Sequence, residues 1–129
     1  MAGSNCLTNM PARNQGACGS CVLFGTTTTL SLNYCKAAEA AGQIFDTTPV
    51  FSAQGIMSCG TRTPMTPYGS SQMYSNGCLG GLEGPIFAWL RDVGVALTSC
   101  NPVVTNSGAG ENHFDAQGEP SAYPACRTT

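Results

Sequence analysis

Hydrophobic residues recur with helical spacing in the first half of the chain. From Ser20 or Cys21 to about Ala41, successive members of one series lie three, four or seven positions apart, which predicts one side of a helix; the series is Leu23, Leu30, Tyr34, Ala37 and Ala41. Gly42 follows where a helix would end. The threonine run at 26–29 favours a strand, because β-branched residues prefer extended backbone, but burial in a core overrides such a preference.

Two further helices are expected. A short helix at 53–58 follows Ser52, which is a suitable N-cap residue. A longer helix runs from about Leu82 to Val93 and ends at Gly94, and Pro85 fits its first turn. The expected core face of this helix comprises Ile86, Leu90, Val93 and Leu97.

Polar, turn-forming residues fill the remaining stretches. Residues 60–77 are rich in Thr, Pro, Gly, Ser and Asn and predict a surface loop, and the same holds from residue 101 onward. The expected fold is therefore mainly α and loop-rich, with a helical unit at 1–100 and a loop-rich tail at 101–129. A chain of this size has a modest core, so its cysteines are expected to stabilise it as disulfides.

Composition excludes several classes of protein. The 129 residues suit a single domain, and the net charge is −2 with 9% charged residues. The sequence has neither the basic patch nor the aromatic platform that a nucleic-acid partner requires. No apolar run is long enough for a membrane span. Eight cysteines point to an oxidising compartment. Residues 1–10 show no signal-peptide pattern, so a leader has been removed or the chain is a fragment.

A structural zinc site is not expected. Cys18 and Cys21 form one CxxC pair, but no second close pair follows, and His113 is the single histidine. Zinc sites need four ligands, usually in two clustered pairs. We expect neither a metal nor another cofactor.

The segment NQGACGSCVLFG at 14–25 combines the groups needed for acyl transfer through a thiol. Cys21 would stand at the first turn of a helix, whose N-terminal field favours the thiolate. Gly16 and Gly19 allow a substrate to approach the backbone closely. The amide of Gln15 and the backbone N–H of Cys21 are candidate donors to an oxyanion.

This segment resembles the active-site signature of papain-like cysteine proteases, Cys-Gly-Ser/Ala-Cys followed by an aromatic residue. FSAQGIMSC at 51–59 and GCLGG at 77–81 resemble two further family segments, in the same order. The resemblance implies that Cys21 is the nucleophile and Gln15 the oxyanion glutamine. It implies substrate binding by Gly19, Ser20, Gly80 and Gly81.

Within the family, the chain is most similar to cathepsin B-like enzymes. The resemblance implies the disulfides Cys6–Cys35 and Cys18–Cys78, and it compares the tail with the occluding-loop region. His113 then compares with a histidine that binds the substrate's C-terminal carboxylate, although an exposed loop histidine is the alternative. With Cys21 free, an odd number of cysteines remains to be paired; the open ones are Cys59, Cys100 and Cys126.

The chain departs from the family pattern at two points. Val22 stands where the family has an aromatic residue, nearly always Trp. The valine is expected to loosen this side of the site. The family's catalytic His and Asn follow the nucleophile by about 130–150 residues. His113 is closer than that and does not fit as the base. The expected molecule is thus the N-terminal, helical half of a papain-like α+β protease.

The sequence therefore predicts a cysteine-type peptidase that lacks its catalytic His and Asn and is inactive alone. Its expected partners are a peptide or protein substrate and the missing C-terminal domain. Without that domain, an apolar patch beside Cys21 is expected to be uncovered. The expected location is lysosomal or secreted. Two alternatives stay open: a non-catalytic, disulfide-stapled binding module or protease relic, and a two-chain enzyme.

Overall fold

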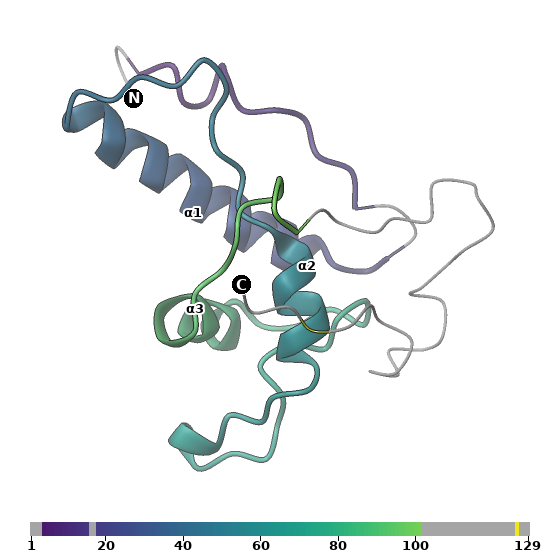
Figure 1. The fold of residues 1–129 in the computed structure, drawn as a ribbon. Helices are drawn as coiled ribbons and strands as arrows, with labels where there is room; N and C mark the ends of the chain where they lie inside the picture. Colours follow the sequence, from purple (N-terminus) through teal and green to yellow (C-terminus); the bar gives the residue numbers. More distant parts are fainter. Residues whose placement is uncertain (1–3, 16–17, 102–125, 127–129) are drawn as a thin grey trace.

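A computed structural model describes residues 4–15, 18–101 and 126 of the chain, which form a helical unit with long loops (Figure 1). Among these residues no strand forms, and extended pairing is limited to single bridges. The predicted helical fold class is confirmed. The elements are α-helix α1 (Cys21–Ala40), α-helix α2 (Ala53–Gly55), π-helical turn η1 (Ile56–Gly60), 3-10 helix η2 (Thr66–Tyr68) and α-helix α3 (Glu83–Asp92).

Helix α1 has the predicted bounds but not the predicted buried face. Gly42 follows its end with a φ of 91°, a left-handed conformation that suits glycine. The expected hydrophobic series is correct at Leu23, which is fully buried, and wrong at Tyr34, which is 46% exposed, and at Ala37, which is also exposed. The buried face instead comprises Leu23, Phe24, Thr26, Thr27, Ser31 and Cys35.

Small hydroxyl residues can occupy this buried face because the helix itself satisfies them. The Thr27 hydroxyl donates to the Leu23 carbonyl at 2.7 Å, and the Ser31 hydroxyl donates to the Thr27 carbonyl at 2.7 Å. A buried hydroxyl with a partner avoids most of its desolvation cost. The threonine run therefore stays helical, as the burial argument anticipates, and lies against the N-terminal segment.

The core lies between α1, α3 and the short helical segment that α2 and η1 form near the middle of the molecule (Figure 1). Ser52 caps α2 as predicted, and its hydroxyl accepts a hydrogen bond from the Gln54 N–H. The predicted helix at 53–58 is present as α2 continued by η1. The largest apolar members of the core are Leu23, Phe24, Ile56, Met57, Tyr74, Ile86 and Trp89.

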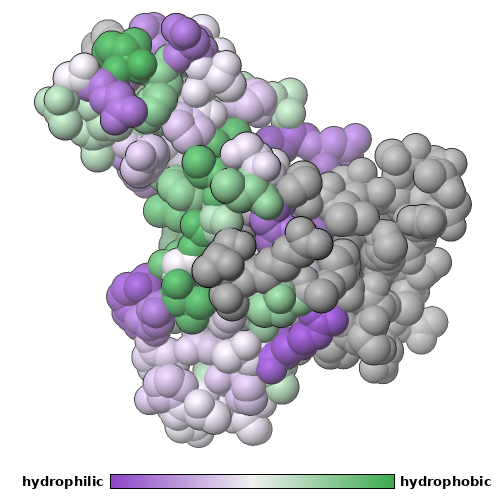
Figure 2. Space-filling model, viewed as in Figure 1, coloured by the Kyte–Doolittle hydropathy of each residue, from purple (hydrophilic) through white to green (hydrophobic). Residues whose placement is uncertain are grey.

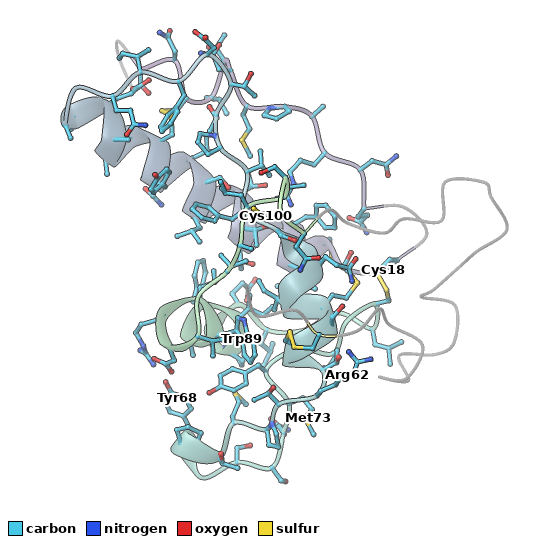
Figure 3. The ribbon with its side chains drawn as sticks, in the orientation of Figure 1. Cys18, Arg62, Tyr68, Met73, Trp89 and Cys100 are labelled. Carbon is cyan, nitrogen blue, oxygen red and sulfur yellow. A yellow bond between two sulfur atoms is a disulfide. The ribbon has the colours of Figure 1, made fainter. Side chains whose placement is uncertain are left out.

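Helix α3 begins one residue after its predicted start and ends one residue before its predicted end. Ile86 and Trp89 are its buried residues, and the Trp89 ring meets Tyr74 edge to face at 5.2 Å (Figure 3). The predicted core face is wrong beyond Leu90, because Val93 is 49% exposed and Leu97 is exposed. Gly94 turns the chain at φ 91°, so the helical spacing no longer applies past α3.

The loop predicted at 60–77 is only partly a surface loop, since Tyr74 and Ser75 are buried. At its far end, the Tyr68 hydroxyl donates to the Asp92 carboxylate and accepts from Arg91, which also forms an ion pair with Asp92 at 2.7 Å (Figure 3). These contacts fasten the loop to the end of α3.

All eight cysteines are placed. Six form the disulfides Cys6–Cys35, Cys18–Cys78 and Cys59–Cys126, while Cys21 and Cys100 carry free, exposed thiols. The first two bonds are the pairs that the resemblance implies, and the third was left open by the sequence. Apart from Asn101 and Cys126, the tail at 101–129 lies outside the described residues, and so does His113.

Among the described residues, no helix is both long enough and apolar enough to cross a lipid bilayer.

Candidate functional site

The free thiol of Cys21 lies at the first residue of the 20-residue helix α1. Backbone N–H groups in a first helical turn have no partner within the helix, and they favour a negative charge close to them. Ser20 occupies the N-cap position, but its side chain makes no capping hydrogen bond. The N–H groups of Leu23 and Phe24 donate to the Ser20 carbonyl, so among the described residues the N–H groups of Cys21 and Val22 are the ones left for an anion.

The loop before α1 is held close to the loop before α3. The Cys18–Cys78 disulfide joins the two loops, and a single parallel bridge pairs Gly19 with Leu79. A Cβ atom on Gly19 would lie 2.4 Å from the Cys78 carbonyl oxygen, a distance that real structures do not allow. Glycine is therefore required here by the close approach of the two backbones.

Gln15 approaches the loop before Cys21 from the N-terminal side. Its side-chain Nε2 donates a hydrogen bond of 2.6 Å to the Cys18 carbonyl. This bond fixes the amide beside the loop that leads into Cys21. Since an amide nitrogen carries two hydrogens, one donor of Gln15 remains for another acceptor.

The glycine pair after Cys78 takes conformations that other residues rarely adopt. Gly80 has a φ of 92° and Gly81 a φ of 155°. A Cβ atom on Gly81 would stand 3.5 Å from Cγ1 of Val22, in ordinary contact. The requirement at this pair is thus conformational, and it directs the chain from the disulfide into α3.

An open groove of about 540 Å³ contains Cys21 and Gly81. It runs along one face of α1, where Cys21, Gly25 and Thr29 follow one another at four-residue spacing, and it meets the first turns of α3. Its described lining is Cys21, Val22, Gly25, Thr26, Thr29, Gly81, Glu83 and Phe87.

The groove unites some of the predicted site residues and leaves others apart. Gln15 and Gly80 are not part of its lining, and Ser20 is fully buried. The Ser20 hydroxyl has no hydrogen-bond partner among the described residues. Gly16 and His113 lie outside the described part of the chain.

Sequence reasoning missed the walls of the groove. Gly25 and Thr29 continue the face of α1 that carries Cys21, and Glu83 and Phe87 share a face of α3. The four-residue spacing from Cys21 was a usable signal for the first pair. No local signal marked the second pair, because its role depends on how α3 packs against α1.

Exposed hydrophobic side chains lie around this site. Leu79 and Leu82 flank the glycine pair, and Leu82 is 70% exposed; Phe87 lines the groove itself. Elsewhere, hydrophobic residues gather over α3 and the segment after it in the middle of one face (Figure 2). Phe87 thus contributes exposed apolar surface to the groove of Cys21.

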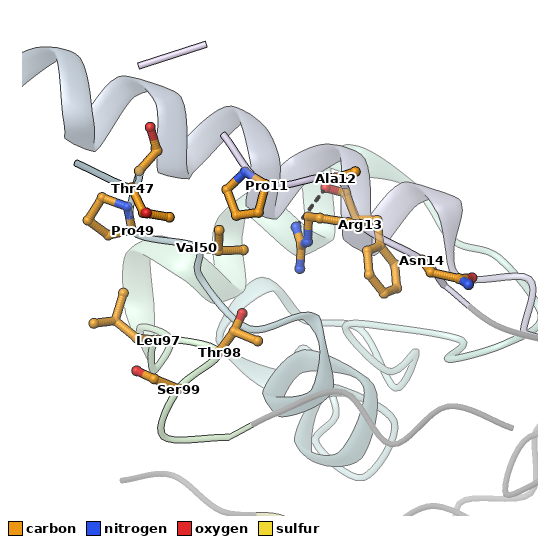
Figure 4. A pocket seen from close by; sticks show the side chains of 12 residues that line it. Pro11, Ala12, Arg13, Asn14, Thr47, Pro49, Val50, Leu97, Thr98 and Ser99 are labelled. Atoms are coloured by element: carbon orange, nitrogen blue, oxygen red, sulfur yellow. Dashed lines mark hydrogen bonds between the residues drawn. The ribbon is translucent and has the colours of Figure 1, made fainter. Parts of the chain in front are cut away.

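A second cavity of about 500 Å³ lies beside Arg13, away from the Cys21 groove (Figure 4). The Arg13 guanidinium donates to the hydroxyls of Thr27 and Thr28 and to the carbonyls of Phe24 and Phe51, and it stacks over the Phe24 ring. Burial lowers the pKa of Arg13. These contacts tie the N-terminal segment to α1, which indicates a structural role.

One group of side chains in the described part of the chain has the ligand types of a metal site. It consists of Cys6, Cys35 and Glu39. The two sulfur atoms are bonded to each other and are not thiolates, so they do not provide metal ligands.

Comparison with protein families places the chain. The sequence model of the family described as papain family cysteine protease matches residues 4–128, which is nearly the whole chain. No curated protein matches the sequence.

Proposed function

The chain belongs to the papain family of cysteine proteases, and from this premise we propose that it is a cysteine-type peptidase that attacks peptide bonds with Cys21. One observation carries the assignment. Cys21 keeps a free, exposed thiol at the start of α1 and in an open groove, whereas Cys18, three residues earlier, is bound in a disulfide.

The proposed chemistry is acyl transfer through a thioester. The Cys21 thiolate attacks the carbonyl carbon, a C–S bond forms, and the carbonyl oxygen becomes an oxyanion. The backbone N–H of Cys21 and the remaining amide hydrogen of Gln15 are the proposed donors to that oxyanion. Collapse of this tetrahedral oxyanion breaks the C–N bond and releases the amine, which takes a proton from a general acid. Water then attacks the thioester carbonyl, the C–S bond breaks, the acyl group leaves as a carboxylic acid, and the thiol is restored.

The general acid and base come, in this proposal, from outside these 129 residues. The sequence contains one histidine, His113, and its distance along the chain from Cys21 is too short for the family's pattern. A histidine from elsewhere in the same polypeptide or from another chain would complete the pair. The exposed residues Leu82 and Phe87 provide an apolar surface that such a domain would cover.

We further propose a cathepsin B-like subtype and a lysosomal or secreted location. The disulfide between Cys6 and Cys35 supports the subtype, and three disulfides in so small a chain support an oxidising compartment. On this proposal, His113 binds the C-terminal carboxylate of a peptide substrate.

Alkylation of the folded chain tests the proposed nucleophile. Iodoacetamide is added at about pH 5.5, where an ordinary thiol is almost entirely protonated, and the labelled sites are mapped by mass spectrometry. Cys21 is expected to be labelled well ahead of Cys100, the other free and exposed cysteine, which serves as the reference in the same molecule. Equal, slow labelling of both would overturn the proposal.

A non-catalytic binding module is the second candidate. Val22 favours it, because the family's aromatic residue is absent beside the nucleophile. A binding module needs no reactive thiol, so a chain that binds peptides equally well with Cys21 intact and with Cys21→Ser, and that fails the alkylation test, would support this candidate instead.

A further inference from the structure

The cavity beside Arg13 is separate from the groove of Cys21 and is built from three segments of the chain (Figure 4). Residues 11–14, 47–50 and 97–99 line it together with Phe24 of α1, and none of these residues lines the Cys21 groove. Two of the segments are joined by the Thr98 N–H, which donates to the Val50 carbonyl at 2.7 Å. The third is held by Arg13, which donates to the Phe51 carbonyl at 3.2 Å. The walls of the cavity are thus fixed to one another by the fold.

The guanidinium of Arg13 carries a charge that no carboxylate among the described residues balances. Its acceptors are two hydroxyls and two backbone carbonyls, all of which are neutral. In the described part of the chain, the ion pair is the exposed one between Arg91 and Asp92. Arg13 is half-buried, and burial lowers its pKa. A cation withdrawn from water without a carboxylate partner is costly, so an anion that enters the cavity is stabilised there.

Two N–H groups of the guanidinium remain for such an anion. An arginine side chain has five N–H donors. In Arg13, Nη1 donates to the Phe24 carbonyl and to two threonine hydroxyls, and Nη2 donates to the Phe51 carbonyl. The Nε–H and the second N–H of Nη2 make no hydrogen bond to the described residues. They belong to one plane, and a carboxylate accepts from such a pair with both of its oxygens.

The rest of the lining suits an apolar body attached to that anion. Pro11, Val50 and Leu97 contribute apolar side chains, and Leu97 is 37% exposed. The Arg13 guanidinium lies toward one end of the cavity and Leu97 toward the other (Figure 4). Methylene groups that leave water for such a surface are stabilised. The volume of about 500 Å³ falls within the range of small-molecule sites.

We infer that the cavity beside Arg13 binds a small organic carboxylate with an apolar body, such as a medium-chain fatty acid. The carboxylate accepts from Nε and Nη2 of Arg13, and the hydrocarbon chain lies along Val50 and Leu97. Because the cavity and the Cys21 groove share no lining residue, this inference goes beyond the proposed peptidase function and does not depend on it.

Arg13 also has a structural reason to be an arginine. It ties the N-terminal segment to α1 and to the Phe51 carbonyl, which requires several donors but no ligand. Since the cavity is open, water can satisfy the remaining N–H groups. The test must therefore measure whether the cavity prefers a carboxylate to a neutral group, and not the stability of the fold alone.

Titration calorimetry of the full chain with three probes measures that preference. Octanoate has both the carboxylate and the chain, octanamide has the chain without the charge, and acetate has the charge without the chain. At about pH 7, where carboxylates are ionised, octanoate is expected to bind at one site and at least about tenfold more tightly than either other probe. Its advantage over octanamide should shrink at about 0.5 M salt.

Leu97 provides variants that leave Arg13 in place. Leu97→Glu adds a carboxylate to the cavity wall, and Leu97→Gln changes the same side chain without the charge. Octanoate is expected to bind at least about fivefold more weakly to Leu97→Glu than to Leu97→Gln, whereas octanamide should not distinguish them. Leu7→Glu adds the same charge at an exposed residue outside the cavity and should leave the affinity for octanoate unchanged.

Arg13→Gln removes the charge itself. If the variant retains the circular dichroism spectrum of the unchanged chain, it is expected to bind octanoate no more tightly than octanamide. Because Arg13 also holds the fold together, the comparison of Leu97→Glu with Leu97→Gln decides the matter where this variant fails to fold.

Four results would overturn the inference. They are the absence of octanoate binding, equal affinities of the unchanged chain for octanoate and octanamide, equal affinities of the two Leu97 variants for octanoate, and loss of octanoate binding in Cys21→Ser. The last result would place the probe in the other groove. None of the four bears on the peptidase proposal, which the alkylation of Cys21 tests, and an unreactive Cys21 would leave the carboxylate site as it stands.

Discussion

Cys18 and Cys78 are joined by a disulfide that fastens the loop before Cys21 to the loop of the glycine pair. The bond spans 60 residues of sequence, and it sets Gln15 and Cys21 on one side of the linkage and Gly80 and Gly81 on the other. The candidate site is therefore assembled from two distant segments, and a covalent bond maintains their spacing.

Removal of this bond is expected to destabilise the fold. Closing a loop of this length limits the unfolded chain, and the double variant Cys18→Ala, Cys78→Ala should lose about 2–4 kcal/mol of unfolding free energy. Urea denaturation of the variant and the unchanged chain under oxidising conditions measures the loss. A midpoint that does not move would show that backbone contacts alone hold the two loops together.

Glycine is expected to be indispensable at position 19 and dispensable at position 25. Gly19→Ala would force a Cβ against the Cys78 carbonyl oxygen and should cost more than about 2 kcal/mol. Gly25 lies within α1, and a Cβ there meets no atom within 4 Å. Gly25→Ala should therefore gain about 0.5–1 kcal/mol. Thermal denaturation of both variants checks the opposite signs.

Arg13 is expected to resist conservative replacement. Its guanidinium reaches the hydroxyls of Thr27 and Thr28 and two backbone carbonyls at once, which a lysine cannot do with one ammonium. Arg13→Lys should lose about 1–3 kcal/mol, whereas Lys36→Arg on the exposed side of α1 should change little. Equal stabilities of the two variants in urea would contradict the structural role given to Arg13.

The contact between Tyr68 and the end of α3 is expected to weaken in acid. Hydrogen bonds from Arg91 and Tyr68 lower the pKa of Asp92 to about 2. This pKa is lower in the folded than in the unfolded state. The contribution of the ionised Asp92 to the free energy of unfolding is therefore complete above about pH 4, and it is lost as the pH falls through about 2.

The difference in melting temperature between the unchanged chain and Asp92→Asn tests this sign. It is expected to be constant between about pH 5 and 7 and to shrink below about pH 4. A difference that grows on acidification would contradict the assignment.

Helix positions were predictable from the sequence because their ends carry clear signals. Ser52 caps α2, and Gly42 and Gly94 turn the chain after α1 and α3. The buried faces were less predictable. Hydrophobic spacing selected Tyr34, but the core side of α1 uses Thr27 and Ser31, whose hydroxyls are satisfied by helix carbonyls and so tolerate burial.

The candidate site shows the same division. The local motif predicts Cys21 as the nucleophile and Gln15 as an oxyanion donor, since both candidates stand in one segment. Glu83 and Phe87 could not be found in this way, because they meet Cys21 only through the packing of α3 on α1. The Cys59–Cys126 bond was equally unpredictable, as spacing alone does not determine disulfide pairing.

The most direct test of Cys21 as the nucleophile uses a peptide aldehyde labelled with ¹³C at its carbonyl carbon. A thiol adds reversibly to the aldehyde without a leaving group, so the adduct requires the nucleophile and the oxyanion donors but not proton donation to an amine. The experiment is done with Cys100→Ser, so that Cys21 is the one free thiol. We predict a hemithioacetal signal that is absent in Cys21→Ser and about tenfold or more weaker in Gln15→Ala. A folded protein that gives no such signal, or that gives the same signal without Cys21, would contradict the account.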